Sequence, residues 1–150
     1  MRGASERARR AFPGQKVGIS VAPDLPFIRA DANLLQQVLF NLLDNAHKYR
    51  GGADPIIHAR QEGKDVVVTV TDEGPGVKPA DLERIFEKFY RGGRPDGRKA
   101  GTGLGLSICR SLVEAMGGTI MAQSPAIRRR GTRIVLRFPV AGPPARETTK

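Results

Sequence analysis

The longest periodic stretch of the chain covers residues 31–49, DANLLQQVLFNLLDNAHKY. Its apolar residues recur every three or four positions, which is typical of an amphipathic helix with one face on a core. The residues of this apolar stripe are Leu35, Leu39, Leu42, Leu43 and Ala46. Asp31 can cap the first backbone N–H groups, and Gly51 can end the helix in the left-handed conformation. The pattern therefore predicts a helix over residues 32–49.

The stretches with the pattern of strands are residues 16–22, 55–62, 65–72, 119–124 and 131–139. A turn at Gly63-Lys64 joins the second and third, which predicts a hairpin. Further helices are predicted over residues 79–90, with Pro79 near the first turn, and over residues 104–116. Strands that come in pairs with helices between them predict a two-layer α+β sandwich. We expect a mixed, mostly antiparallel sheet with three helices on one face, and not a doubly wound parallel sheet.

The polar side of the long predicted helix carries an unusual set of residues. Asn41, Asn45 and Lys48 fall within roughly 60° of one another around the helix axis. Surface positions of helices favour Glu, Lys, Arg or Gln, and each Asn costs roughly 0.7 kcal/mol relative to Ala. A carboxamide offers a neutral oxygen and two donors, which suits a metal-bound phosphate. From this stretch alone, a solvated face and a ligand-binding face both remain open.

Two glycine clusters follow. Asp72-Glu73-Gly74-Pro75-Gly76 comes directly after an apolar strand, so a carboxylate at the strand end could accept hydrogen bonds from a flat polar ligand. Taken alone, this cluster is explained more simply as an Asx-type turn. The second cluster runs from Gly101 to Leu106 and leads into a helix, where free backbone N–H groups form an anion site. It matches neither the P-loop pattern nor the dinucleotide fingerprint.

Composition narrows the class of protein. The chain has 150 residues, enough for a single domain, and a net charge of +10 from 25 Lys+Arg against 15 Asp+Glu, which predicts attraction to polyanions. Aromatic residues make up only 5%, without Trp, so stacking platforms for nucleic acid are scarce. No apolar run approaches the roughly 18–20 residues of a membrane span, and no signal peptide is recognisable. The single cysteine, Cys109, is expected to be a small buried hydrophobe in a cytosolic setting.

The order of these motifs resembles the catalytic, ATP-binding domain of bacterial sensor histidine kinases, part of the ATPase superfamily that includes gyrase. NLLDNAHKY is similar to the N box of that family, DEGPG and GTGLGL to its two glycine boxes, and IFEKFYR (85–91) to its phenylalanine box. The resemblance covers residues 16–139. Residues 86–120 resemble more particularly the sensor kinases of Kdp potassium-uptake systems, which implies a potassium-responsive parent protein.

The resemblance implies that ATP and Mg²⁺ lie between the long helix, the glycine boxes and a mobile lid over about residues 91–103. Asn45 would hold Mg²⁺, Asn41 would orient water or metal, and Lys48 would meet the phosphates. Asp72 would accept a hydrogen bond from the adenine amino group. The other residues that the resemblance places around the nucleotide are Tyr49, Gly74, Gly76, Arg91, Gly101, Thr102, Gly103, Leu104, Gly105 and Thr132.

The implied activity is transfer of the ATP γ-phosphoryl group to a histidine. The superfamily's ATP hydrolases usually carry Glu where Asn41 stands, so Asn41 favours transfer over hydrolysis. The family's phosphorylated histidine is usually followed by an acidic residue; His47 precedes Lys48 and His58 precedes Ala59, so neither fits. The acceptor is therefore expected on a dimerisation domain outside this chain, with a response regulator as a further partner.

The implied organisation has three parts. Residues 1–14 are expected to end the preceding dimerisation region, residues 15–140 to form the catalytic domain, and residues 141–150 to be a disordered tail. The parent protein is expected to be a homodimer in the inner membrane with this domain in the cytoplasm.

Three alternatives remain at this point. A nucleotide-binding module without transfer activity would keep the site but not the reaction, although none of its expected residues is missing. A protein-serine kinase of the anti-sigma-factor type would keep the fold and change the substrate. A nucleic-acid-binding domain would explain the charge of +10, but no recognised binding motif supports it.

Overall fold

The computed structural model describes residues 18–49, 54–74, 76–87, 105–125 and 131–141. Five strands form one sheet in the order β1-β2-β3-β5-β4. Their bounds are β1 Gly18–Val21, β2 Ile56–Glu62, β3 Asp65–Asp72, β4 Thr119–Gln123 and β5 Thr132–Pro139. β1 pairs with β2 in parallel, and the other three pairings are antiparallel. The sheet is therefore mixed and mostly antiparallel, and the expected hairpin at β2 and β3 is confirmed.

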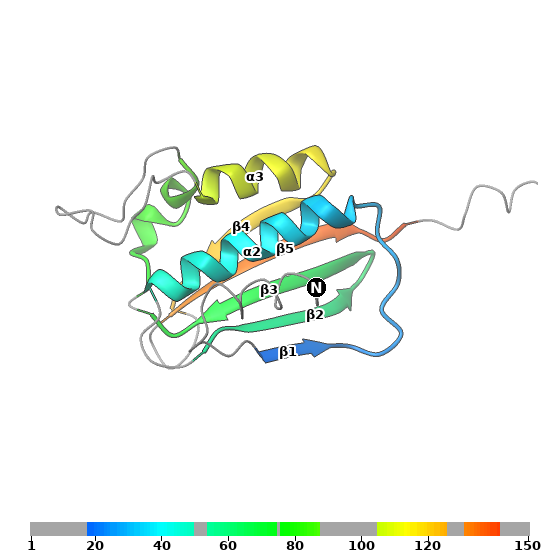
Figure 1. The fold of residues 1–150 in the computed structure, drawn as a ribbon, viewed down its shortest axis with the longest axis horizontal. Helices are drawn as coiled ribbons and strands as arrows, with labels where there is room; N and C mark the ends of the chain where they lie inside the picture. The colour runs from blue at the N-terminus through cyan, green and yellow to red at the C-terminus, as the bar shows by residue number, and fades with distance from the viewer. Residues whose placement is uncertain (1–17, 50–53, 75, 88–104, 126–130, 142–150) are drawn as a thin grey trace, which may run out of the picture.

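Helices α2 (Ala32–Tyr49) and α3 (Gly105–Ala115) cross the same face of this sheet, as Figure 1 shows. α2 connects the parallel neighbours β1 and β2, and α3 lies between β3 and β4 in the sequence. The two-layer α+β sandwich of the sequence analysis is confirmed. Among the described helices, none is both long enough and apolar enough to cross a membrane.

The predicted helix over residues 32–49 is confirmed together with its cap. The Asp31 carboxylate accepts the backbone N–H groups of Asn33 and Leu34, at 2.9 and 3.1 Å. These two bonds satisfy donors that the first turn of a helix leaves unpaired. Leu39 and Leu43 of the predicted apolar stripe are fully buried in the core. The apolar stripe seen in the sequence therefore faces the sheet.

The core lies between the helices and the inner face of the sheet. The strands alternate, so every second residue of β3 and β5 points toward α2 and α3. These buried inward residues include Val66, Val68, Val70, Ile134, Leu136 and Phe138. The core is thus a single layer of mostly aliphatic side chains, with Phe138 among them, and it holds the ends of the strands and helices in fixed relative positions.

The continuous helix predicted over residues 79–90 is wrong for the described part of that segment. Two single turns of 3-10 helix are present instead, η1 (Pro79–Asp81) and η2 (Arg84–Phe86). Helices this short have little stability of their own, so packing decides their form. The Phe86 ring is buried and lies beneath the Arg110 guanidinium of α3, 5.5 Å from the ring centre. Two backbone hydrogen bonds, 2.9 and 3.3 Å long, each join residues three positions apart and close the turn of η2.

The remaining expectations on domain organisation fall outside the described residues. These are the basic segment 1–14, the lid over 91–103 and the tail from residue 142. Ala141, the first residue of the expected tail, is described, and its backbone N–H donates to the carbonyl of Phe27 at 2.8 Å.

Candidate functional site

The topology gathers the ends of several elements at one edge of the molecule. β3 ends at Asp72, and β5, which runs antiparallel to it, begins opposite at Thr132. β4 ends at the same edge, because Gln123 pairs with Arg133. Figure 1 shows that α2 also ends there and that α3 begins there. This edge therefore brings together the first glycine cluster, the end of the long helix and the start of α3, which are far apart in the sequence.

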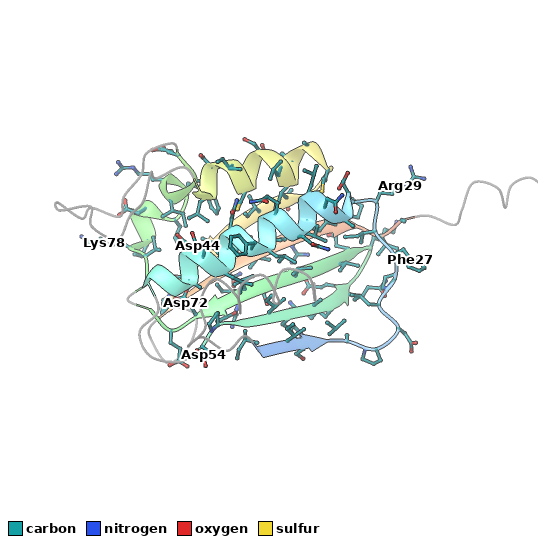
Figure 2. The ribbon with its side chains drawn as sticks, in the orientation of Figure 1. Phe27, Arg29, Asp44, Asp54, Asp72 and Lys78 are labelled. Carbon is teal, nitrogen blue, oxygen red and sulfur yellow. The ribbon has the colours of Figure 1, made fainter. Side chains whose placement is uncertain are left out.

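Asp72 provides a buried carboxylate at that edge. The residue is 8% exposed, and Figure 2 places it at the same end of the molecule as Lys78, away from Phe27 and Arg29. Its Oδ1 accepts the backbone N–H of Gly74 at 2.7 Å, the geometry of an Asx turn. Burial raises the pKa of this carboxyl, and hydrogen bonds from the backbone N–H groups of Gly74 and Thr132 act in the opposite direction. The turn considered in the sequence analysis is thus present, and it orients the carboxylate.

Gly131 brings β5 into contact with this loop and was not singled out by the sequence analysis. Its φ of +88° lies in the left-handed region, and a Cβ added there would overlap the carbonyl oxygen of Asp72. Glycine is therefore required at residue 131 by both conformation and space. The sequence signal for Gly131 is the dipeptide Gly131-Thr132 at the start of a predicted strand. Only Thr132 of this pair was predicted to be a site residue.

Asn41 lies between the two helices. Its Oδ1 accepts a hydrogen bond from Nε2 of Gln37 at 3.1 Å, and its side chain also hydrogen-bonds to the thiol of Cys109 on α3. The Cys109 sulfur contacts the carbonyl of Val38 at 3.7 Å. Burial raises the pKa of this thiol to about 12, with the Asn41 bond acting in the opposite direction. Asn41 is therefore half-buried against α3 and is not part of a solvated helix face.

Asn45 differs from Asn41. It lies one turn further along α2 and is half-buried, and its carboxamide makes no hydrogen bond to any residue in the described part of the chain. Within the same described residues there is no group of three or more His, Cys, Asp or Glu side chains that could hold a metal ion. A magnesium ion bound with a nucleotide needs few protein ligands, because phosphates and water supply the rest. A half-buried amide oxygen that these residues leave free fits that requirement.

Several expected site residues cannot be placed. The backbones of Lys48 and Tyr49 belong to α2, but their side chains lie outside the described part of the chain. The other expected site residues outside the described ranges are Arg91, Gly101, Thr102, Gly103 and Leu104. Gly105 is the first residue of α3 and is exposed, and a Cβ there would meet no atom within 4 Å. Of the expected set, the structure brings together Asp72, Gly74, Gly76 and Thr132, with Asn41 and Asn45 on the helix that ends beside them.

Comparison with known proteins identifies this arrangement. Residues 30–142 match the family described as histidine kinase-, DNA gyrase B-, and HSP90-like ATPase. The sensor protein KdpD of Clostridium acetobutylicum is 40% identical over 121 residues, which is 79% of this chain and 13% of that protein. KdpD of Escherichia coli is 43% identical over 107 residues, 71% of this chain and 12% of its own length. The adaptive-response sensory kinase SasA of Trichormus variabilis is 41% identical over 120 residues, which is 79% of this chain and 30% of the kinase.

Comparison with solved structures agrees with the family match. The mycobacterial sensor histidine kinase MprB superposes with a TM-score of 0.78 at 29% identity, covering 95% of this chain and 93% of that one. Full-length ShkA, solved in complex with AMPPNP, gives a TM-score of 0.75 at 32% identity, covering 97% of this chain and 30% of its own. The reported relatives are sensor kinases, so the serine-kinase alternative is not favoured. The chain belongs to the histidine kinase-, DNA gyrase B-, and HSP90-like ATPase family, as a catalytic ATPase domain of the sensor histidine kinase type.

Proposed function

We propose that this chain binds ATP with Mg²⁺ at the edge where Asp72, Thr132 and the end of α2 meet. The observation that carries the proposal is the buried Asp72 carboxylate, which two backbone N–H groups hold in a fixed orientation. A carboxylate can accept more hydrogen bonds than these two, so Asp72 can also accept one from the exocyclic amino group of adenine. Guanine presents a carbonyl oxygen at the equivalent position, which would repel the carboxylate. The site should therefore select adenine nucleotides.

The phosphates would lie between α2 and the start of α3. Asn45 is the residue with an amide oxygen available for Mg²⁺, and Asn41 would keep its position through its contacts with Gln37 and Cys109. Lys48 follows on the same helix and would offer its ammonium group to the phosphates. When bound, the magnesium ion neutralises phosphate charge. The contribution of the protein is then positioning and charge, which is the main catalytic requirement of phosphoryl transfer.

The acceptor would be a histidine imidazole in another part of the longer protein. The chain spans 13% of the length of the Clostridium KdpD that it resembles. In the transfer, the bond between the γ-phosphorus and the β–γ bridging oxygen breaks, a nitrogen–phosphorus bond forms, and ADP leaves. His58 alternates with the buried residues Ile57 and Ala59, so it points to the face of the sheet opposite the helices. That orientation supports an acceptor supplied from elsewhere.

The wider biology is proposed on the names of the relatives. A dimerisation and phosphoacceptor domain and a response regulator are the expected partners, because sensor kinases pass the phosphoryl group on. The two KdpD relatives favour a potassium-linked signal. We further propose a homodimeric parent protein in the cell membrane, with this domain on the cytoplasmic side.

The nucleotide site is tested by calorimetric titration of the chain with ATP, ADP and GTP, with and without Mg²⁺. We expect ATP to bind more tightly than GTP, and Asp72→Ala should abolish this preference and weaken ATP binding without eliminating it, because no other described carboxylate is buried at this edge. Asp65→Ala is the matched control, since Asp65 begins the same strand at its far end and pairs with Arg137 at the surface. Equal affinity for ATP and GTP, or unchanged binding in Asp72→Ala, would contradict the proposal.

A further inference from the structure

Ser124 joins three segments that are distant in the sequence. It follows β4 directly, and its hydroxyl oxygen accepts the backbone N–H of Val77 at 2.9 Å. The same hydroxyl donates to the carbonyl oxygen of Gly131 at 2.8 Å. A hydroxyl group can donate and accept at once, so one side chain satisfies both backbone groups. Ser124 therefore ties the loop after β3 to the start of β5.

Both tied segments border Asp72. The first segment runs from Asp72 to Val77 and contains the Gly74 N–H that binds the carboxylate. The second begins at Gly131, which lies against the Asp72 carbonyl, and continues to Thr132, whose backbone N–H is the other donor. Ser124 thus fixes the distance between the two backbone segments that orient the Asp72 carboxylate.

The packing around the hydroxyl is close. A Cβ added at Gly76 would lie 2.8 Å from the Ser124 Oγ and 3.3 Å from the Gly131 carbonyl oxygen. Gly76 also has a φ of +86°, a conformation that favours glycine. The glycine at residue 76, which the resemblance places around the nucleotide, is required here by the approach of Ser124.

We propose that Ser124 is a positioning residue for the adenine site, acting through the Asp72 loop. The inference rests on the proposed nucleotide function and adds to it a residue outside the motifs that indicated it. Without the hydroxyl, the Val77 N–H and the Gly131 carbonyl lose a shared partner, and the two segments can separate. The carboxylate would then lose its fixed orientation toward the amino group of adenine, while the magnesium and phosphate end of the site would be unchanged.

The test is titration of the full chain with ATP and GTP in two pairs of variants. Ser124→Ala removes the hydroxyl and is compared with wild type. Ser124→Thr and Ser124→Val have the same shape and differ only in the hydroxyl, so any effect of the added methyl group cancels between them. Gln123→Ala changes the exposed neighbouring residue and controls for disturbance of β4. Unfolding midpoints are measured for every variant.

We expect the ratio of GTP to ATP dissociation constants to fall about tenfold in Ser124→Ala, because weakening the charge-assisted hydrogen bond between the Asp72 carboxylate and the adenine amino group is worth roughly that factor. The same difference should separate the valine from the threonine variant. If Ser124→Ala does not fold, the threonine and valine pair decides alone. Wild-type selectivity in all variants that lack the hydroxyl would overturn the proposal.

A double-mutant cycle distinguishes positioning from a general loss of stability. In the Asp72→Ala background, Ser124→Ala should cause no further loss of nucleotide affinity, since its effect passes through the carboxylate. Additive losses would show that Ser124 acts independently of Asp72 and would overturn the inference. Failure of the wild-type chain to prefer ATP over GTP would instead reject the proposed nucleotide site, so the two failures are distinguishable.

Discussion

At the scale of single residues, Asp72 holds a carboxylate where burial disfavours its charge. Burial raises the pKa of this group, and the N–H donors of Gly74 and Thr132 offset only part of that effect. A pKa that is higher in the folded than in the unfolded protein gives stability at low pH. This stability is fully present below the unfolded value and is lost as the pH rises through the folded value. At neutral pH the charge is therefore retained at a cost in stability, as expected of a functional group.

Asp72→Asn should separate stability from binding. We expect its free energy of unfolding at about pH 7 to equal that of wild type or exceed it by at most about 1 kcal/mol, because the neutral amide avoids the desolvation cost. The advantage should shrink toward about pH 4, where the wild-type carboxyl becomes protonated. Urea unfolding at both pH values measures this, and calorimetry should show loss of adenine selectivity. A variant that is less stable than wild type at pH 7 and recovers at pH 4 would contradict the assignment.

At the scale of elements, α2 and α3 pack closely against each other around Cys109. Cys109 on α3 is fully buried, and it contacts the Val38 carbonyl and the Asn41 side chain of α2. Apolar burial raises the pKa of the thiol to about 12, so almost no thiolate is present at neutral pH. The asparagine beside the proposed metal ligand is thereby held by a neighbouring helix.

The close packing of α2 against α3 predicts that Cys109 resists alkylation. In the native chain, modification by iodoacetamide at about pH 8 should be at least about a hundredfold slower than in the urea-unfolded chain, because the thiol must first be exposed by opening of the structure. Mass spectrometry at successive times gives both rates. Native and unfolded rates that agree would mean that α2 does not cover the thiol. Leu39→Ala, which removes a fully buried side chain of α2, should cost about 2–5 kcal/mol and accelerate the native reaction.

At the scale of the whole molecule, the net charge of +10 favours any polyanion. Long-range attraction of this kind acts on the phosphates of a nucleotide and does not distinguish bases. Discrimination between bases arises from short-range hydrogen bonding at Asp72. The affinity for nucleotides and the selectivity between their bases should therefore respond differently to salt.

We expect the affinity for ATP to fall as ionic strength rises from about 0.05 to about 0.5 M, because the screening length shortens over that range. The affinity for GTP should fall by the same factor, so the ratio of the two dissociation constants stays constant. Titrations at several salt concentrations test this. A ratio that collapses with salt would place the discrimination in long-range electrostatics and not at the buried carboxylate.

The local elements could be predicted from the sequence because their signals are local. The helix over residues 32–49 has a continuous apolar stripe and its own cap at Asp31, and both are present. The carboxylate at Asp72 was selected because it ends a strand and precedes glycines. The segment 79–90 carried a weaker signal, and its short turns took the form that the packing of Phe86 beneath Arg110 required.

The amino-acid sequence by itself determined the long periodic elements, the fold class and the residues of the two glycine clusters, since these signals depend on residues a few positions apart. Only the tertiary structure decided how those residues are held. The hydroxyl of Ser124 meets Val77 across 47 positions, and Cys109 meets Val38 across 71. Pairings over such separations have no periodic signal, because they arise only when the sheet and the helices have packed together.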